Sequence, residues 1–400
     1  MIKNILSVAL CCLAVSAARG IEEKTLVAKC EAHFRALLAA MADQPKDCVP
    51  RSWSGGKYKM VKPTDWCSGF TPGSLWYLYE LTGREEWKAA AVEWTEKLIE
   101  PLRHDANNHD VGFRTYCSAG NALRLTGDAR YAEFLHDTSA ALRTRYDDRL
   151  GLIRSWNNWA GTPERDYFRP SFIVIIDNMM NLELLEWDAK NGGDPKSDVI
   201  ARSQADRTDA HHFRPDGSAY HILGYNPKNG RIHGVYAGQG ACVEGTWARG
   251  QAWAIYGFTV MYRETKDPRY RDRAVKAAAY WLGAPTLPAD GVPYWDFRAA
   301  DIPNEERDAS AACVTLSALC ELMDYVPAEQ AAAYRAYVEK TLAALASPAY
   351  FAAPGENGSF LLKHSVGCKP HGGEVDVPLN YADYYFLETL VRSHKKGILR

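Results

Sequence analysis

The sequence predicts an all-α fold, a single-domain (α/α)6 toroid in which six helical hairpins form a ring. Three observations lead to this prediction. Apolar residues recur at helical spacing through most of the chain. Helices that are apolar on every side alternate with amphipathic ones, as expected of an inner and an outer layer. The first and last helices have no partner except each other, so the repeats close into a ring instead of an open solenoid.

The hairpins follow one another along the chain. Each inner-type helix ends at a short polar or glycine stop, such as Thr82-Gly83, and an amphipathic helix follows it. The last inner-type helix is expected to pair with the first helix of the chain. The predicted helices span residues 21–42, 69–81, 85–102, 113–125, 129–145, 177–190, 197–212, 249–263, 268–281, 308–325, 328–345 and 380–392.

The N-terminus has the pattern of a secretory signal peptide. Lys3 supplies the positive start, residues 5–14 form a short apolar core, and small residues at 16–18 stand where a signal peptidase would cleave. The apolar stretch is too short to cross a bilayer comfortably, and no later segment has the length of a membrane helix. We therefore expect residues 1–20 to be removed and residues 21–400 to form the barrel. The protein is expected to be exported to the periplasm or the extracellular space.

Charge and cysteine content narrow the function. The formal net charge is -2 over 400 residues without a long run of one sign, so neither nucleic acid nor a membrane surface is an expected partner. Histidines and cysteines lack metal-ligand spacing, and neither a metal nor another cofactor is expected. Cys313 and Cys320 lie on one apolar helical stretch and are expected to be small core residues, and no disulfide is assigned. No obligate protein partner is inferred.

Polar residues stand at the N-terminal ends of the inner-type helices. In a ring of hairpins the inner helices run in the same direction, so these ends meet at one mouth. The residues are Asp65, His109, Asp110, Asp177, Arg249, Asp308 and Asp383. Each has an alternative interpretation as a cap or a buried polar partner. Tryptophans at positions 66, 156, 159, 247 and 253 flank them, and because such rings stack against sugar faces the group indicates a carbohydrate cleft.

Asp177 is the residue on which the two interpretations differ most. It follows one apolar run and opens another, so it either caps the following helix or does chemistry. On residue type alone the cap is the more common outcome, because an Asp side chain accepts from free N–H groups and suits the positive end of the helix dipole. The two interpretations require different charges. A cap is ionised at neutral pH, whereas a proton donor keeps its proton for part of a cycle.

Five motifs occur in a fixed order along the chain. They are Asp65-Trp66-Cys67-Ser68-Gly69-Phe70, His109-Asp110-Val111-Gly112-Phe113, Ile176-Asp177-Asn178-Met179-Met180-Asn181-Leu182, Trp247-Ala248-Arg249-Gly250-Gln251-Ala252-Trp253 and Asn380-Tyr381-Ala382-Asp383-Tyr384-Tyr385. This series resembles that of glycoside hydrolase family 88, the unsaturated glucuronyl hydrolases, over nearly the whole mature chain. No single motif is decisive, but the ordered set is specific. The resemblance implies an (α/α)6 barrel, no metal, and substrates made by polysaccharide lyases, which leave a 4,5-unsaturated uronic acid at the non-reducing end.

The resemblance assigns the chemistry to two acids. Asp177 would protonate C4 of the C4=C5 bond and then take a proton from the water that adds at C5, giving a hemiketal that falls apart. One carboxyl can act as acid and then as base only if its pKa lies near the working pH. Burial and a nearby carboxylate would both raise it. Asp110 matches the family's other essential acid and is assigned to hold Asp177 protonated and to contact the sugar hydroxyls.

Seven further residues receive binding roles from the resemblance. The tryptophans would wall the unsaturated ring or line the entrance, and the polar residues would bind its hydroxyls and its carboxylate. The tryptophans are Trp66, Trp156 and Trp253, and the polar residues are His109, His221, Gln239 and Arg249. An arginine suits a carboxylate because its fork can bond both oxygens. The alternative for Arg249 is a salt bridge to a neighbouring inner helix. A long insert, residues 209–239, would overhang the cleft, with a plain structural loop as its alternative.

One departure from the family pattern bears on the leaving sugar. Some members recognise sulfate through a Ser-x-x-Ser-x-Lys pattern near the C-terminus. Here the stretch is His364-Ser365-Val366-Gly367-Cys368-Lys369, with Cys in place of the second Ser and Lys one place early. Lys363, Lys369 and His371 keep the loop basic. Sulfated and unsulfated disaccharides are therefore both possible substrates.

The predicted function is release of the 4,5-unsaturated uronic acid from lyase-made oligosaccharides, with glycosaminoglycan products favoured. The unsaturated uronyl oligosaccharide is then the expected partner. Three alternatives are kept. A related hydrolase on the same barrel would remove unsaturated rhamnogalacturonyl or galacturonyl units. A sugar epimerase would use a pair of histidines as acid and base. A carbohydrate-binding protein would use the aromatic mouth without chemistry.

Overall fold

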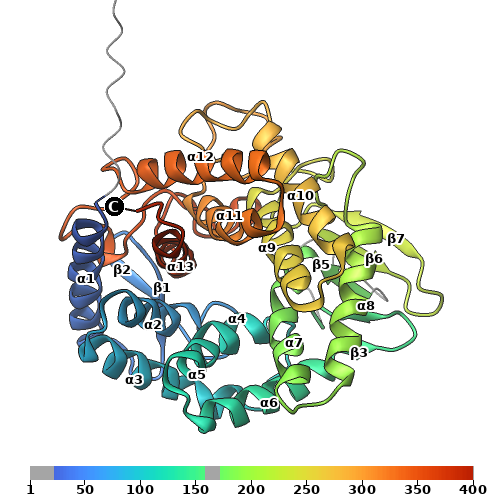
Figure 1. Ribbon diagram of the computed structural model, residues 1–400, viewed down its shortest axis with the longest axis horizontal. Helices are drawn as coiled ribbons and strands as arrows, with labels where there is room; N and C mark the ends of the chain where they lie inside the picture. Colours follow the sequence, from blue (N-terminus) through green and yellow to red (C-terminus); the bar gives the residue numbers. More distant parts are fainter. Residues whose placement is uncertain (1–21, 158–171, 400) are drawn as a thin grey trace, which may run out of the picture.

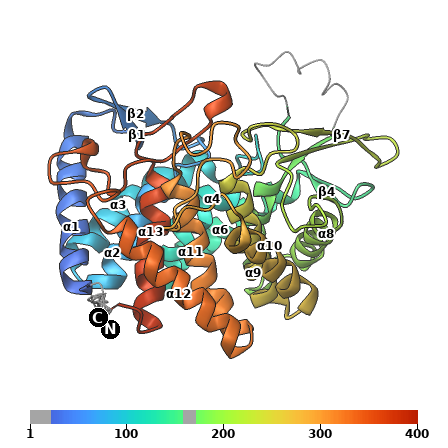
Figure 2. The same ribbon diagram turned by 90° about the horizontal axis from the view of Figure 1, so that it is seen from above.

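The computed structural model describes residues 22–157 and 172–399 and consists mainly of helices. The predicted signal peptide and Trp159 lie outside the described residues. Figure 1 shows the helices arranged as a ring with one layer inside the other. In Figure 2 short strands and long loops gather at one end of the ring, and the C-terminal part of α13 lies toward the other end. The two ends of the ring therefore differ in structure.

The inner layer is made of helices that contact one another in chain order, and the last of them returns to the first. Its members are α2 (Phe70–Thr82), α4 (Val111–Thr115) with η2 (Tyr116–Gly120) and α5 (Asn121–Thr126), η4 (Ile176–Asn181) with α7 (Leu182–Lys190), α9 (Ala248–Thr265), α11 (Ala309–Leu322) and α13 (Asn380–Lys395). These segments are buried on nearly every side, since almost all residues of α11 and α13 are inaccessible to solvent. This burial explains why they lack a polar face.

The outer layer consists of amphipathic helices that pack on the inner ones. Its members are α1 (Glu23–Ala40), α3 (Glu85–Leu102), α6 (Ala129–Arg143), α8 (Lys196–His211), α10 (Pro268–Gly283) and α12 (Ala328–Leu345). The buried residues of α3 recur every three or four positions, which gives the helix one apolar stripe. Asp128 and Asp267 begin α6 and α10 by accepting hydrogen bonds from the backbone amides of Arg130 and Arg269. The two kinds of helix predicted from the sequence therefore occupy the two layers.

Two predicted inner helices are not continuous α-helices. Residues 113–125 contain the π-helical segment η2, and residues 177–181 belong to the 3-10 helix η4, so regular α-helix begins only at α7. Side chains explain the first irregularity, because the Ser118 hydroxyl donates to the carbonyl oxygens of both Arg114 and Thr115. Such bonds compete with the regular backbone ladder. The 3-10 segment η4 contains Asp177, one of the predicted site residues, and a stretch of 3-10 helix often marks a functional hinge or a sequence under strain.

Three small antiparallel sheets are absent from the all-α prediction. β1 (Val49–Ser54) pairs with β2 (Lys57–Val61), β3 (Tyr146–Asp147) pairs with β4 (Leu152–Ile153), and β6 (Ile222–Tyr225) lies between β5 (Phe172–Ile175) and β7 (Ile232–Tyr236). The β5 residues are all buried, and a short apolar run of this kind does not distinguish a strand from a helix by its periodicity. β6 and β7 belong to the predicted insert, residues 209–239, and they pair with β5, which precedes η4.

The predicted pairing of the first and last helices is wrong in its main contact. α13 lies between α11 and α2 in the inner layer, while α1 packs against α2 from outside. α1 meets the end of α13 through His394, whose Nδ1 lies 2.9 Å from the Glu23 carboxylate. The reason is that α13 is apolar on every side and needs two inner neighbours, which a single outer helix cannot supply.

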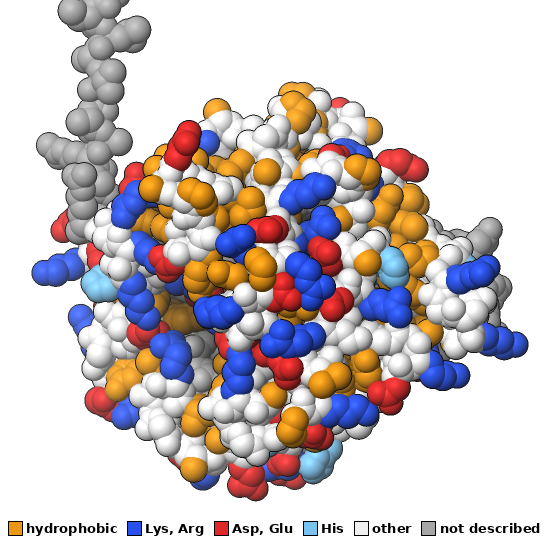
Figure 3. All heavy atoms as spheres, turned by 45° about the vertical axis from the view of Figure 1, so that its right-hand side comes forward, with side chains coloured by type: hydrophobic (Ala, Val, Ile, Leu, Met, Phe, Trp, Pro, Cys, Tyr) orange, Lys and Arg blue, Asp and Glu red, His pale blue; other side chains and the backbone are white. Residues whose placement is uncertain are grey.

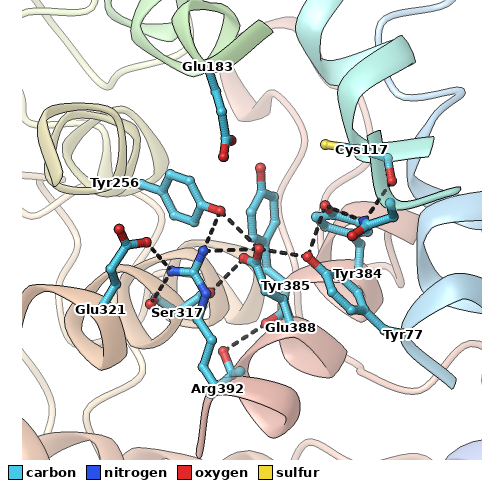
Figure 4. A network of polar contacts seen from close by, with 12 residues as sticks. Tyr77, Cys117, Glu183, Tyr256, Ser317, Glu321, Tyr384, Tyr385, Glu388 and Arg392 are labelled. Carbon is cyan, nitrogen blue, oxygen red and sulfur yellow. Dashed lines mark hydrogen bonds and ion pairs between the residues drawn. The ribbon is translucent and has the colours of Figure 1, made fainter. Parts of the chain in front are cut away.

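A buried carboxylate ties the inner helices together toward their C-terminal ends (Figure 4). Glu388 of α13 accepts hydrogen bonds from Tyr77 of α2 at 2.7 Å, from Tyr256 of α9 at 2.9 Å and from Ser317 of α11 at 2.6 Å. Arg392 of α13 lies 3.2 Å from the same carboxylate. One charge is therefore satisfied by groups from four inner helices.

The outer surface and the cysteines agree with the composition. Figure 3 shows Lys and Arg side chains interspersed with Asp and Glu side chains over the face in view.

In the described part of the chain, no helix is long and apolar enough to span a bilayer. All eight cysteines among the described residues are free thiols, and Cys313 and Cys320 are fully buried in α11 as predicted.

We expect Glu388→Gln to destabilise the fold. The amide keeps the shape but removes the charge that three hydroxyl groups and Arg392 surround, and breaking one partner of a buried ionic network costs about 3–5 kcal/mol. Chemical denaturation followed by circular dichroism would measure this loss. Glu339→Gln, which removes an exposed partner of Arg335, is the matched control and should change the free energy of unfolding by less than about 1 kcal/mol. Equal stability of both variants would contradict the importance given to Glu388.

Candidate active site

A cavity of about 130 Å³ lies at the strand-bearing end of the ring. Six of the nine predicted site residues line it, and they are Trp66, Asp110, Trp156, Asp177, Gln239 and Arg249. The other lining residues are Arg51, Ile175, Trp247, Gly367, Cys368 and Tyr381. The N-terminal ends of the inner helices and the β5 strand thus bring residues that are far apart in sequence to one place.

Three of the acids predicted at this mouth accept hydrogen bonds from backbone amides. Asp308 accepts from the amides of Ser310 and Ala311 and so caps α11. Asp383 accepts from the amides of Leu361 and Leu362 at 2.8 and 3.1 Å, and Asp65 accepts from the amide of Cys67 at 3.1 Å. For these three acids the structure supports the alternative of a capping or buried structural role.

Asp110 and Asp177 differ from the other acids because neither side chain caps a helix. Asp110 stands at the cap position of α4, yet the amides of Gly112 and Phe113 donate instead to Asn181 Oδ1, at 2.7 and 3.3 Å. Asp177 lies in the 3-10 helix η4 and makes no capping hydrogen bond. The cap interpretation of Asp177 is therefore wrong, and both carboxyls stay available for other contacts.

Burial determines the charge of both carboxyls. Loss of solvent and, after it, the neighbouring carboxyl of Asp110 raise the pKa of Asp177 to about 7, against the opposite influence of Arg249 and Trp253. Burial likewise raises the pKa of Asp110 to about 7, against the attraction of Arg114 and Arg145. Near neutral pH each carboxyl can therefore hold or release a proton, as an acid that later acts as a base requires.

Two neutral histidines lie directly behind the acids. His109 Nε2 is 3.3 Å from Asp110 Oδ1, and His221 Nε2 is 3.7 Å from Asp177 Oδ2. Burial lowers the pKa of both imidazoles to about 3, so neither carries a charge at neutral pH. The backbone amide of Gln239 lies 2.9 Å from His221 Nδ1. Position 238, which precedes Gln239, requires glycine for two reasons. Its φ is +60°, and a Cβ there would lie 2.2 Å from His221 Nδ1.

The aromatic residues form the walls and the floor of the site. Trp66, Trp156 and Trp247 line the cavity, in agreement with the predicted aromatic mouth. Trp253 does not line it, and its ring packs on Phe113 and Tyr385 at centroid distances of 5.1 and 5.4 Å. Trp253 therefore lies beneath the acids as part of a fully buried floor.

Arg249 is held by protein groups on several sides. Its Nη1 lies 3.1 Å from Asp308 Oδ2 and donates to the Val366 carbonyl, and its Nη2 donates to the Gly367 carbonyl at 2.7 Å. The salt bridge to a neighbouring inner helix, considered as the alternative for this residue, is thus present. Its Nε has no hydrogen-bond partner among the described residues, and the side chain still lines the cavity.

Arg51 is a cavity residue that the sequence analysis missed. It lies on β1, between the first two predicted helices, 21–42 and 69–81. Its guanidinium bonds to the carboxylates of Asp65 and Glu374 and stands over the ring of Trp66 at 5.7 Å. No spacing in the sequence signals this position, because the contacts join residues from separate parts of the chain.

A larger cavity, of about 750 Å³, opens toward the other end of the ring. Its acids are paired with arginines, since Glu183 contacts Arg263, Glu388 contacts Arg392, and Glu80 contacts Arg124 at 2.6 Å. Figure 4 shows Glu388 with Arg392. No unpaired carboxyl comparable to Asp177 is found in that lining among the described residues. The smaller cavity is therefore the better candidate despite its size.

Metal ligation has no evident basis in the described residues. Within 22–157 and 172–399, no three His, Cys, Asp or Glu side chains are grouped as ligands of one ion would be. The side chains that line the cavity supply carboxyls, guanidinium groups and aromatic rings, and the imidazoles of His109 and His221 lie next to the carboxyls.

The chain is similar in sequence and in structure to proteins of the same name. No protein-family model matches the chain. It is 42% identical over 333 residues to an unsaturated glucuronyl hydrolase of Formosa agariphila, which covers 83% of this chain and 80% of that protein. The crystal structure of an unsaturated glucuronyl hydrolase specific for heparin superposes with a TM-score of 0.86 at 40% identity, covering 94% of this chain and 98% of the other.

A third similar structure contains a sugar ligand. It is a mutant of the unsaturated glucuronyl hydrolase of Streptococcus agalactiae complexed with dGlcA-GalNAc6S. The superposition has a TM-score of 0.78 at 25% identity and covers 95% of this chain and 94% of that one. The similarity thus extends over the whole described ring and includes a protein with a bound unsaturated disaccharide.

We expect Asp177→Asn to stabilise the protein at high pH. The folded pKa of Asp177 is about 7 against an ordinary 3.8, so the folded state binds more protons between these values. Its contribution to stability therefore falls as the pH rises from about 4 to about 7, and the asparagine removes this loss. The midpoint of thermal unfolding should rise by at least about 2 °C near pH 8, which corresponds to roughly 1 kcal/mol, and should change little near pH 4.

Asp148→Asn is the matched control, because Asp148 is an exposed acid paired only with Lys196 at 3.3 Å among the described residues. Asp148→Asn should leave the difference between the midpoints of thermal unfolding at pH 8 and at pH 4 as it is in the parent protein. A shift of the same size at both pH values in Asp177→Asn would contradict the raised pKa.

Proposed function

This chain belongs to glycoside hydrolase family 88, the unsaturated glucuronyl hydrolases, and we propose that it removes a 4,5-unsaturated uronic acid from the non-reducing end of lyase-made oligosaccharides. Glycosaminoglycan products are the favoured source, because similar proteins include a heparin-specific enzyme and one with bound dGlcA-GalNAc6S. The observation that carries the proposal is the pair of buried carboxyls, Asp110 and Asp177, which cap no helix and line one cavity.

Asp177 is the proton donor in this proposal. Its proton goes to C4, which leaves positive charge at C5 and the ring oxygen. The carboxylate so formed takes a proton from the water whose oxygen bonds to C5, and Asp177 is protonated again. The hemiketal opens and releases the neighbouring sugar. A carboxyl with a pKa of about 7 suits both steps, because it gives and regains a proton with little cost near neutral pH.

The cavity walls fit an unsaturated uronate. Trp66, Trp156 and Trp247 offer ring faces for the sugar. Arg51 and Arg249 line the cavity, and a guanidinium group suits the carboxylate of a uronate. Trp253 and the two histidines act from behind the wall, by holding the acids in a dry environment.

The basic loop left both sulfated and unsulfated substrates open in the sequence, and in the structure two of its lysines contact protein groups. Lys369 contacts Glu305 at 2.5 Å and also Glu306, and its ammonium lies 5.5 Å from the centre of the Trp295 ring. Lys363 donates to the Pro348 carbonyl at 2.8 Å. We therefore assign no sulfate-binding role to Lys369.

The proposal also covers the architecture of the ring and the destination of the protein. The ring of helices is proposed to be an (α/α)6 barrel of six hairpins formed by residues 21–400 as one domain. Residues 1–20 are proposed to direct export to the periplasm or the extracellular space, where lyase products of extracellular polysaccharides would be met.

Asp177→Asn should abolish turnover of unsaturated disaccharides from chondroitin, hyaluronan and heparin lyases. The ultraviolet absorbance of the C4=C5 bond is lost as the parent enzyme works, and the variant should lower kcat at least about 100-fold, because its general acid and base is gone. In deuterium oxide the parent product should carry one deuterium at C4, as seen by mass spectrometry. Asp148→Asn should retain activity. Undiminished turnover by Asp177→Asn would exclude the proposed acid, and an intact disaccharide with the parent enzyme would indicate a binding protein.

Lys369→Ala should change kcat/KM equally for a 6-sulfated unsaturated chondroitin disaccharide and its unsulfated counterpart. If Lys369 bound the sulfate, its loss would remove a charge-assisted hydrogen bond and lower kcat/KM for the sulfated substrate alone by roughly tenfold or more. Lys340→Ala, on the outer helix α12, serves as the control. A selective loss with the sulfated substrate would show that the lysine leaves Glu305 and Glu306 when substrate binds.

A further inference from the structure

Asn178, the residue after Asp177, holds His109 in a defined orientation. Its side-chain Nδ2 donates to the Ile153 carbonyl at 2.8 Å, which fixes the carboxamide with Oδ1 on the other side. That oxygen contacts His109 Nδ1. Both residues are fully buried, so no water competes for these contacts.

The contact determines which nitrogen of His109 carries hydrogen. A carboxamide oxygen can only accept, so Nδ1 must be the donor. The imidazole is neutral, because burial lowers its pKa to about 3. A neutral imidazole has one N–H, and therefore Nε2 presents a lone pair.

The lone pair faces the second acid of the site. His109 Nε2 lies 3.3 Å from Asp110 Oδ1 and has no hydrogen-bond partner among the described residues. An ionised carboxylate would repel this nitrogen, whereas a protonated carboxyl can donate O–H to it. The other charged or titratable groups that face these two residues are Arg114, Arg145, Asp65, Asp177 and His221. The two arginines favour ionised Asp110, and burial together with the His109 lone pair opposes them.

We propose that Asn178 is a positioning residue that fixes His109 as the Nδ1–H tautomer and thereby makes Asp110 the acid that retains its proton in the free enzyme. This proposal rests on the proposed function for the roles of Asp110 and Asp177. Because Asp110 keeps its proton, Asp177 is the only one of the two acids that becomes a carboxylate when it gives its proton to C4. An ionised Asp110 would place two negative charges side by side and oppose the release of that proton. The proposal thus replaces the role that the resemblance implied for Asp110, in which its charge keeps Asp177 protonated.

The first test reads the tautomer directly. The protein is labelled with ¹⁵N-histidine, the His109 ring signals are assigned by their loss in His109→Gln, and the protonated nitrogen is identified by NMR near pH 7. The parent should carry hydrogen on Nδ1. Asn178→Leu removes the acceptor and should move the hydrogen to Nε2, where it can donate to Asp110. Asn178→Asp retains an acceptor for Nδ1 and should keep the parent tautomer.

The second test measures the consequence for the reaction. With Nε2–H facing it, Asp110 ionises at lower pH and its charge raises the pKa of Asp177. The alkaline limb of the kcat/KM profile of Asn178→Leu should therefore move to higher pH, and kcat should fall at least about tenfold, as loss of the correct imidazole tautomer does in other enzymes. Asn191→Leu, at the exposed end of α7, should leave both unchanged.

The outcomes distinguish this proposal from the function on which it rests. Hydrogen on Nε2 in the parent would overturn it, as would a folded Asn178→Leu that keeps both the Nδ1–H tautomer and the parent pH profile. If Asn178→Leu does not fold, the parent and Asn178→Asp spectra still decide the tautomer. Active Asp177→Asn would instead refute the proposed function while leaving the His109 tautomer as measured.

Discussion

The hydrogen bonds between the Asp177–Asn181 turn and the start of α4 are the constraint on which the candidate site depends. Asn181 accepts from the amides of Gly112 and Phe113, and Asn178 accepts from His109. A helix start needs acceptors for its free amides, and ordinarily the residue at the cap position supplies one. Because Asn181 meets this need from the neighbouring inner segment, Asp110 is released from it. The turn thus provides one acid and at the same time frees the other.

Burial makes these two acids chemically unusual. The floor beneath them is aromatic, with Trp253 packed on Phe113 and Tyr385, and the neighbouring imidazoles are neutral. Charged groups do approach, but Arg249 is engaged by Asp308 and two carbonyl oxygens. Desolvation is therefore the largest influence on both carboxyls, and it outweighs the attraction of the arginines. At the far end of the ring the acids meet arginines directly, which explains why a larger cavity there lacks similar groups.

Sequence periodicity predicted the two layers of helices, because inner and outer helices bury different fractions of their surface. The resemblance to a known family supplied the nine candidate residues, and six of them line one cavity. Five of the six stand near the start of an inner helix or on the insert, and Trp156 follows β4. The β5 run and the π-helical turn escaped prediction, because a short apolar run fits strand and helix alike and because side-chain to backbone bonds are invisible in a pattern. Arg51, the cap by Asn181 and the pairing of Lys369 with Glu305 were also missed. Each joins residues distant in sequence, so only the folded chain reveals them.

The attachment of residues 366–367 has an evolutionary consequence. Arg249 holds this stretch of the cavity wall through the carbonyl oxygens of Val366 and Gly367, and main-chain oxygens are the same whatever side chains the loop carries. Cys368, the next residue of the wall, lines the cavity, and its side chain can therefore change without loss of this anchorage. Val366 is buried, and a Cβ on Gly367 would lie 2.8 Å from Glu374 Cβ, so these two positions are constrained. The backbone of the wall is thus held independently of the side chain at position 368. A single substitution there would change the surface that a ligand in the cavity meets, with little cost to the rest of the ring.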